Sequence, residues 1–252
     1  MKRTTFIIIT LLLLFISQKS KSQAFQSGEE ITFKMYYGFV TGGTATLSLM
    51  ETKINGREIY YARAVAKTVG VANSIYNVYD VYSSFFDKET CLPIKDIRDV
   101  TEGNYKRYNE VTYNHDKQVL TSQKSGKHNF EGKIFDIVSA FYFARKENLF
   151  ANLAINETIK IPTYFTDEFW DLEIRFKGYE TIETNLGTIR CMKFVPLVEP
   201  GRVFDREDDL KIWISDDSNY IPIRIQMDLI VGSFKGDLVS YKNLVTELKF
   251  ED

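Results

Sequence analysis

The chain of 252 residues has few of the side chains on which metal sites and acid–base catalysis depend. It contains 2 histidines and 2 cysteines. Histidine titrates near neutral pH and is the commonest metal ligand, so its scarcity disfavours both kinds of chemistry. His115 and His128 lie far from Cys91 and Cys191 in the sequence, which indicates neither a zinc site nor a cysteine–histidine nucleophile pair. We therefore expect no cofactor and no metal.

An excess of charge of one sign is also lacking. The 32 lysines and arginines face 34 aspartates and glutamates, which gives a net charge of -2. A protein that binds a polyanion gains affinity by neutralising phosphates with a positive surface, so nucleic acid is excluded as an expected partner. Gly126-Lys127 and Gly132-Lys133 lack the upstream glycine and the following Ser or Thr of a phosphate-binding loop, which excludes an ATPase.

Only one long apolar run is present, and it lies near the N-terminus. Lys2 and Arg3 give the N-terminus a positive charge. Residues 6–16 are apolar except for Thr10, and Ser-Lys-Ser follows at residues 20–22. These are the three parts of a secretory leader. A run of about 11 apolar residues is much shorter than the roughly 20 that span a bilayer. We predict a Sec-type signal peptide over residues 1–22, and no transmembrane segment after it.

The leader predicts an exported protein, located in the periplasm or secreted, either free or peripheral to the outer membrane. Export leads to an oxidising compartment, where Cys91 and Cys191 could close a long loop as a disulfide. Free cysteines are, however, commonly small buried core residues. The sequence leaves both alternatives open.

Alternation of apolar and polar residues dominates the chain after the leader. Gly42-Gly43 and Asn55-Gly56 turn the chain between the first strands. No linker divides residues 23–252, which favours one mainly β domain. Because the edges of a sheet must be closed or covered, the fold expected is one antiparallel β-barrel or a strongly curved open sheet with one short amphipathic helix. The expected strands cover approximately residues 31–37, 44–49, 59–69, 78–86, 92–102, 105–113, 118–123, 157–165, 169–178, 188–197, 210–215, 221–231 and 234–248.

The helix is predicted over residues 136–148. Ile137, Phe141 and Ala144 recur at helical spacing, and Asp136 can cap the first turn. Basic residues at the other end suit the negative pole of the helix. We expect the three apolar side chains to be buried against the sheet.

The same helix carries a polar stripe, which is the candidate ligand-binding site. Asp136, Ser139, Tyr142 and Arg145 recur every three residues and therefore share one face. One interpretation has the stripe facing a groove, where Arg145 meets an anionic head group. In the other, Asp136 only caps the helix and Arg145 only pairs with an acid of the sheet.

Aromatic residues are plentiful, with 15 Tyr, 19 Phe and 2 Trp. On alternating strands they either fill the core or line a cavity for an apolar or sugar ligand. Trp213 is predicted to be a buried anchor of a late strand. The other aromatic residues in question are Tyr60, Tyr61, Tyr79, Tyr82, Phe85, Phe86, Phe165, Phe169 and Trp170.

Carboxylates support an alternative function, a hydrolase of envelope glycans. Paired acids perform glycoside hydrolysis and also bind Ca²⁺, although the spacing here matches no calcium-loop template. In the alternative interpretation these acids have no catalytic role and belong to a solvated charged loop and to a turn. A structural interaction domain without a ligand is a third hypothesis. The acids are Asp205, Glu207, Asp208 and Asp209, beside Arg202 and Arg206, together with Asp216 and Asp217.

Short motifs follow one another in order over nearly the whole chain after the leader. The most distinctive is WISDD at residues 213–217. The others are Gly28-Glu29, GGTA at 42–45, YNVYD at 76–80, EGNYK at 102–106, DIVSAFYFAR at 136–145, GTIRC at 187–191 and PIR at 222–224. Together they resemble the exported bacterial family of domain of unknown function 3108 (DUF3108), in its Bacteroidetes form. The resemblance implies an exported β-rich protein and no known activity. We therefore expect a protein that catalyses no reaction and binds an apolar or amphiphilic ligand, such as a lipid, or a cell-envelope protein.

Overall fold

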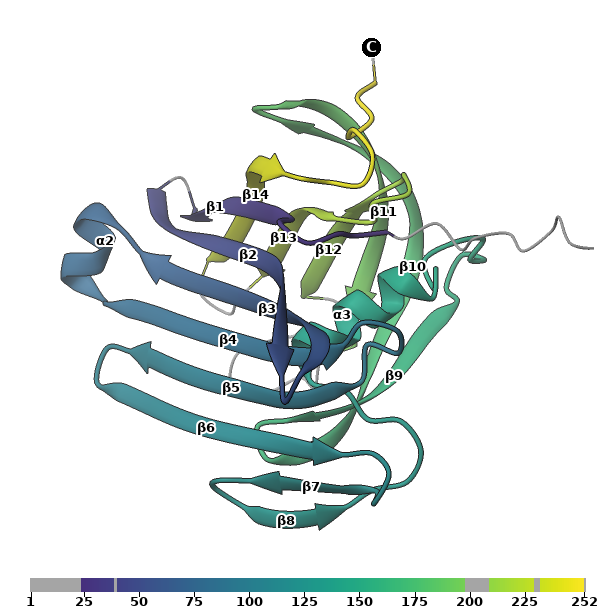
Figure 1. The fold of residues 1–252 in the computed structure, drawn as a ribbon. Coiled ribbons are helices and arrows are strands. Elements are labelled where there is room, and N and C mark those ends of the chain that lie inside the picture. The colour runs from purple at the N-terminus through teal and green to yellow at the C-terminus, as the bar shows by residue number, and fades with distance from the viewer. Residues whose placement is uncertain (1–23, 39, 198–208, 229–231, 252) are drawn as a thin grey trace, which may run out of the picture.

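The computed structural model describes residues 24–38, 40–197, 209–228 and 232–251. The described strands all belong to one antiparallel sheet (Figure 1). They are β1 (Glu30–Tyr37), β2 (Val40–Ile54), β3 (Arg57–Thr68), β4 (Val78–Asp87), β5 (Pro93–Glu102), β6 (Tyr105–Asn114), β7 (Val119–Ser122), β8 (Gly126–Asn129), β9 (Thr158–Phe165), β10 (Glu168–Thr184), β11 (Gly187–Pro196), β12 (Leu210–Ser215), β13 (Pro222–Asp228) and β14 (Ser233–Lys242).

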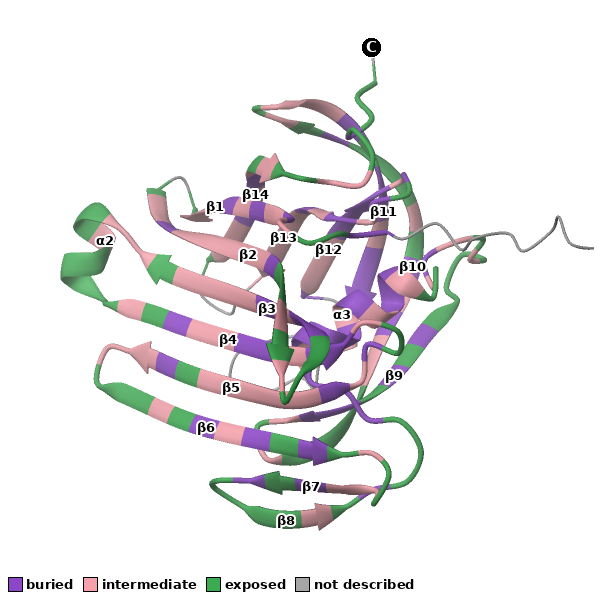
Figure 2. Ribbon diagram, in the orientation of Figure 1, coloured by how far each residue is buried: buried purple, intermediate pink, exposed green. Residues whose placement is uncertain are grey.

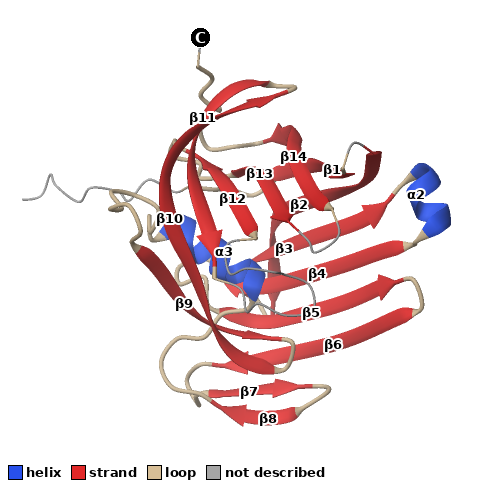
Figure 3. Cartoon of the chain, turned by 180° about the vertical axis from the view of Figure 1, so that it is seen from behind, coloured by secondary structure: helices blue, strands red, loops and turns tan. Residues whose placement is uncertain are grey.

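Two meanders build this sheet. Strands β1 to β8 follow one another from the middle of the sheet to one edge, and β14 to β9 run from the middle to the other edge. The meanders join where β1 pairs with β14, with Glu30 opposite Lys242. The sheet curves strongly, but its edge strands β8 and β9 do not pair with each other, so it is an open curved sheet and not a closed barrel (Figures 1 and 3).

The predicted strands agree with the observed ones except in a few places, one of which is β2, which runs from Val40 to Ile54 and not only over residues 44–49. Strand β8 was not predicted, β10 continues beyond residue 178 to Thr184, and β14 ends at Lys242. In β10 the register shifts between Phe176 and Gly178, and Gly178 has φ of 112°. A β-bulge of this kind interrupts the alternation from which a strand is predicted, which explains why the predicted strand stopped there.

Helix α3 (Ile137–Lys146) connects the two meanders and lies within the concave side of the sheet (Figures 1 and 3). It packs against β3, β4 and β9. Asp136 caps it, because Oδ1 accepts hydrogen bonds from the backbone N–H groups of Val138 and Ser139 at 2.9 and 3.0 Å. The predicted helix is thereby confirmed. A second helix, α2 (Gly70–Ile75), links β3 to β4 and has no buried residue.

Two large hydrophobic clusters form most of the core. The first surrounds α3, which is largely buried (Figure 2), and includes Phe86 and Ile214. The second lies along β1 and β10 to β14 and includes Trp213, which is 5% exposed. Trp213 and Ile214 are adjacent in β12 and therefore project from opposite faces of the strand. The predicted burial of Trp213 is confirmed, and its Nε1 donates a hydrogen bond to Glu180 at 2.7 Å.

Cys91 and Cys191 are both free and buried. Cys91 belongs to the cluster around α3, and Cys191 belongs to the cluster that contains Trp213. In this structure the two thiols are not bonded to each other and pack into separate parts of the core. Burial raises the pKa of each thiol to about 12, so both remain protonated at neutral pH.

Candidate functional site

The polar stripe of α3 agrees with the interpretation in which Asp136 caps the helix and Arg145 pairs with an acid. Asp136, Ser139, Tyr142 and Arg145 are each at most 4% exposed and face the protein interior. The other interpretation had this stripe directed into a groove. Of the three apolar residues expected against the sheet, Ala144 is buried, whereas Ile137 and Phe141 are partly exposed and line the apolar groove described below. The interior accepts the stripe because most of its polar groups have hydrogen-bond partners there, which removes most of the penalty of burying them.

Arg145 shows this most clearly. Its Nη1 and Nη2 donate to the two carboxylate oxygens of Glu29 at 2.6 and 2.7 Å, which forms a buried bidentate ion pair. Nε donates to the backbone oxygen of Asn219 at 2.8 Å, and Nη2 also donates to that of Ala24 at 2.7 Å. Arg145 thus ties α3 to the N-terminal segment and to the turn after β12.

The other stripe residues are also held in place by protein groups. Asp136 accepts a hydrogen bond from Ser84 Oγ at 2.6 Å, and Ser139 Oγ donates to the backbone oxygen of Asp136 at 3.2 Å. The Tyr142 ring stacks on Phe86 with centroids 5.3 Å apart, and its buried hydroxyl has no partner among the described residues. Asp136 also lines the small polar pocket described below.

An apolar groove with a volume of about 420 Å³ opens between α3 and the inner face of the sheet. This volume falls within the range of roughly 300–1,000 Å³ that is usual for small-molecule sites. Its lining is almost entirely apolar and comes from both meanders. The lining residues are Ile31, Phe33, Ala45, Thr46, Leu47, Ala64, Val65, Ala66, Tyr82, Ile137, Val138, Phe141, Phe165, Pro222 and Ile225.

Small side chains on the floor of the groove create its space. Ala45 is the register partner of Ala66, and Leu47 is the register partner of Ala64. Directly opposed residues of antiparallel strands project from the same face, so these alanines lie side by side beneath the helix. Larger side chains at these positions would fill the groove. Its volume therefore depends on the small residues of β2 and β3.

The aromatic residues fulfil both of the roles considered for them. Tyr60 and Phe86 are at most 2% exposed and fill the core. Tyr82 and Phe165 line the apolar groove. Trp170 is 38% exposed and, with Phe169, lines a separate open pocket.

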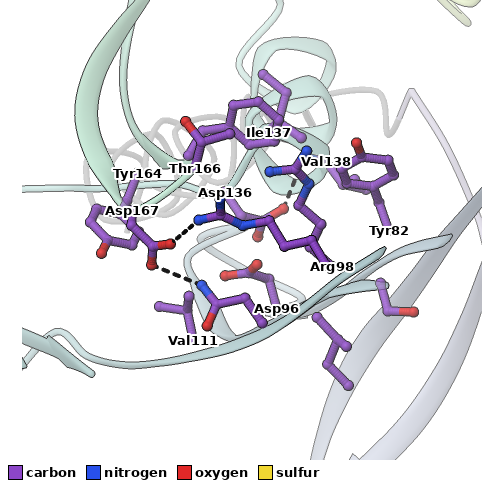
Figure 4. A pocket seen from close by; sticks show the side chains of 15 residues that line it. Tyr82, Asp96, Arg98, Val111, Asp136, Ile137, Val138, Tyr164, Thr166 and Asp167 are labelled. Carbon is purple, nitrogen blue, oxygen red and sulfur yellow. Dashed lines mark hydrogen bonds and ion pairs between the residues drawn. The ribbon is translucent and has the colours of Figure 1, made fainter. Parts of the chain in front are cut away.

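A small polar pocket adjoins the apolar groove. The two share Tyr82, Ile137, Val138 and Phe165 as lining residues, and the polar pocket has a volume of about 30 Å³. Figure 4 shows charged side chains that meet there from β5, from the start of α3 and from the turn after β9. These polar lining residues are Asp96, Arg98, Arg107, Asn109, Asp136, Tyr164, Thr166 and Asp167.

Asp167 holds the two edge regions of the open sheet together. From the turn between β9 and β10 it accepts hydrogen bonds from Asn109 Nδ2 at 2.8 Å, from Ser122 Oγ at 2.5 Å and from Ser125 Oγ at 3.1 Å. It also pairs with Arg107. Burial raises the pKa of Asp167, but the hydrogen bonds from these groups outweigh it and hold the pKa below its usual value. We call this cluster the Asp167 latch.

Arg98 lies where the polar pocket meets the apolar groove. Its guanidinium carbon is 5.8 Å from the ring centroid of Tyr82 and 5.4 Å from that of Phe165, which is cation–π geometry. Its Nε is buried and has no hydrogen-bond partner among the described residues. The nearby Asp96 carboxyl accepts a hydrogen bond from Tyr113 at 2.8 Å. Burial and then the charge of Asp136 raise the pKa of Asp96 well above its usual value.

Asp80 is a second carboxyl with a raised pKa. It lies on β4, two residues before Tyr82, and projects from the same face of the strand as Tyr82. It is 8% exposed. Burial and the nearby Glu102 raise its pKa to about 6, against the backbone hydrogen bond from Thr101 and the charge of Arg98, which lower it. Because the pKa in the folded state is above the ordinary value, this contribution to stability is present at low pH and is lost as the pH rises through about 6.

The variant Asp80→Asn is expected to remove that pH dependence. Asparagine keeps an oxygen for the Thr101 N–H but cannot ionise beside Glu102. Relative to wild type, the Tm of the variant should be nearly unchanged at about pH 4 and higher by a few degrees at about pH 8. Thermal melts at the two pH values measure this. The exposed Asp99→Asn on β5 is the control, and a Tm difference that is equal at both pH values would contradict the prediction.

The described carboxylates of the hydrolase alternative each interact with other groups of the protein. Asp216 forms an ion pair with Arg190 at 2.7 Å. Asp217 is buried and accepts hydrogen bonds from Ser215 Oγ and from the Asn219 N–H, which shapes the turn after β12. Asp209 is buried as well. Residues 202–208 lie outside the described part of the chain.

Neither a cluster of metal-ligating side chains nor a membrane-spanning helix is found among residues 24–38, 40–197, 209–228 and 232–251. No group of three or more His, Cys, Asp or Glu side chains is placed to hold a metal ion there. Within the same ranges, no helix is long and apolar enough to cross a membrane.

Comparisons with known proteins agree on the fold. A β-barrel-like protein of domain of unknown function DUF1849 from Brucella abortus superposes with a TM-score of 0.55 at 9% identity, over 87% of this chain and 98% of that chain. A DUF1089 family protein from Pseudomonas aeruginosa gives a TM-score of 0.38 at 11% identity, over 74% of this chain and 89% of that one, which is too low to bear on the fold. No curated protein matches the chain.

The family assignment follows from the sequence itself. The family model described as protein of unknown function (DUF3108) matches residues 32–239. The match begins in β1 and ends in β14, so it includes both meanders and the helix between them. The chain belongs to the DUF3108 family.

Proposed function

We propose that this protein is exported and binds an apolar or amphiphilic ligand, such as a lipid, in the apolar groove, without catalysing a reaction. The groove is the observation that carries the proposal. It has the volume of a small-molecule site, its lining is almost wholly apolar, and a polar pocket adjoins it. The leader over residues 1–22 supports export to the periplasm or the outside of the cell.

Ala66→Phe is the variant that tests the groove. Ala66 lies on the floor opposite Ala45, where a phenyl ring would occupy the ligand volume. The probe is N-phenylnaphthylamine, an uncharged dye that fluoresces in apolar surroundings. We expect saturable binding to wild type and affinity weaker by about tenfold or more for the variant, because the ring excludes the dye.

Lys67→Phe is the matched control, since Lys67 is the next residue of β3, is exposed and projects from the other face. It should bind the dye as wild type does. Equal dye binding by wild type and Ala66→Phe would contradict the groove as the site.

Native mass spectrometry of the protein recovered from the cell envelope tests export and ligand together. The expected chain begins near Gln23 and carries an extractable amphiphile. A cytoplasmic chain that retains Met1 would contradict export. Hydrolysis of envelope glycans by the same sample would support the hydrolase instead, and a chain that binds neither dye nor lipid would support a structural interaction domain.

A further inference from the structure

We propose that the ligand is a single-chain amphiphile with a carboxylate head group, and that Arg98 binds this carboxylate at the polar end of the apolar groove. The inference rests on the proposed function and assigns the chemical class of its ligand. It concerns Arg98, which lies on β5 and not on the helix.

The sheet register leads from the apolar groove to Arg98. One ladder of directly opposed residues crosses the first five strands, in the order Ile31, Leu47, Ala64, Tyr82 and Arg98. Opposed residues share a face of the sheet, so the first four line the groove and the fifth stands where the groove ends. Along this ladder the side chains change from apolar at Ile31 to positively charged at Arg98. An amphiphile with an anionic head group has the matching change from apolar chain to charged head.

The charge of Arg98 is not neutralised by an ion pair. Arg98 forms no salt bridge with any of the described residues, and its buried Nε lacks an acceptor. The guanidinium lies beside the rings of Tyr82 and Phe165, which stack on each other with centroids 6.3 Å apart, and these contacts orient it without supplying an anion. A buried donor without a partner is unfavourable, and an incoming carboxylate removes that penalty.

The acids of the same pocket are engaged elsewhere. Asp167 pairs with Arg107 in the latch. Asp136 accepts hydrogen bonds from Ser84 and from the first turn of α3. Asp96 accepts the Tyr113 hydroxyl, and its raised pKa favours the neutral form. Arg98 also lowers the pKa of Asp80 through its charge, but no ion pair joins the two among the described residues, so the positive charge of Arg98 is not neutralised by any of these acids.

The size of the polar pocket distinguishes a carboxylate from a larger anion. Its volume is about 30 Å³. One water needs about 10–15 Å³ by the same measure, so the pocket accommodates a group of only a few heavy atoms. The planar guanidinium matches both carboxylate and phosphate in a bidentate arrangement, so the small volume is what favours the carboxylate. A glycerophosphate head group exceeds this space.

Displacement of N-phenylnaphthylamine from the mature full-length chain tests the assignment. The competitors are hexadecanoate, hexadecanol and hexadecyl phosphate, which share one chain and differ in the head group. Wild type should bind hexadecanoate about tenfold or more tightly than hexadecanol, which is the scale of one charge-assisted interaction. Hexadecyl phosphate should bind more weakly than hexadecanoate.

Arg98→Gln should abolish the preference for hexadecanoate over hexadecanol while its affinity for hexadecanol stays close to that of wild type. Arg98→Lys, which keeps the charge but loses the planar fork, should retain part of the preference. Arg63→Gln is the matched control, because Arg63 on β3 projects from the face opposite Ala64. It should keep the full preference. Circular dichroism of each variant verifies that it is folded.

The failures of the two proposals are distinguishable. If Ala66→Phe blocks the dye but Arg98→Gln keeps the full preference, or wild type shows none, the groove binds ligands and the carboxylate assignment is overturned. Equal binding of hexadecyl phosphate and hexadecanoate also overturns it, since Arg98 would then recognise anions in general. If wild type binds neither dye nor any competitor, the proposed function itself fails and this inference fails with it.

Discussion

Arg145→Ala is expected to destabilise the protein by about 3–5 kcal/mol, because it removes one partner of a buried ion pair. Arg145 and Glu29 are 1% exposed or less, so Glu29 would remain as an uncompensated buried charge. The backbone oxygens of Ala24 and Asn219 would lose their donor as well. Urea unfolding followed by circular dichroism gives the change in the free energy of unfolding.

The double variant Glu29→Gln with Arg145→Met is the control. It removes both charges and keeps most of the volume, and it should be more stable than Arg145→Ala alone. A loss of less than about 1 kcal/mol for Arg145→Ala would contradict the prediction, because that is the range of exposed ion pairs. Retained dye binding by the folded fraction would separate this structural role from ligand binding.

Trp213→Ala is expected to reduce stability by a similar amount, about 3–5 kcal/mol, through the cavity that it leaves. Trp213 is 5% exposed within the second cluster, and its ring also lies 5.3 Å from Lys193 Nζ. Its Nε1 hydrogen bond to Glu180 would be lost too. Thermal and urea unfolding measure the effect.

The second tryptophan of the chain provides the comparison. Trp170 is 38% exposed, and Trp170→Ala should leave the Tm nearly unchanged. Trp213→Phe should fall between wild type and Trp213→Ala, because it keeps most of the ring volume. If the Tm of Trp213→Ala equals that of Trp170→Ala, then Trp213 does not anchor the sheet.

Local sequence patterns predicted most of the elements. Alternation places Ile31 and Phe33 on the inner face of β1, and helical spacing with a capping Asp136 places α3, because both signals depend only on near neighbours. Which face of α3 is buried depends on distant residues instead. The partner of Arg145 is Glu29, which is 116 positions away in the sequence. Helical periodicity groups residues on a face but does not say what that face meets.

Arg98 was missed for a related reason. It lies in β5 among Asp96, Ile97 and Asp99, where no apolar alternation marks an inner face. Its importance comes from the register that sets it opposite Tyr82. The short turn between β5 and β6, at Gly103, was the one local signal that fixes part of this register, since it sets Arg98 opposite Asn109.

The pairing of β1 with β14 also determines the order in which the sheet can be completed. Glu30–Tyr37 is the first described strand of the chain and Ser233–Lys242 is the last, yet they are neighbours in the middle of the sheet. Until the last strand is synthesised, β1 and β13 each have an unpaired side. Contacts between segments so far apart in sequence slow folding. A growing chain therefore has two separate meanders to form early, and the centre of its sheet is the last part to close.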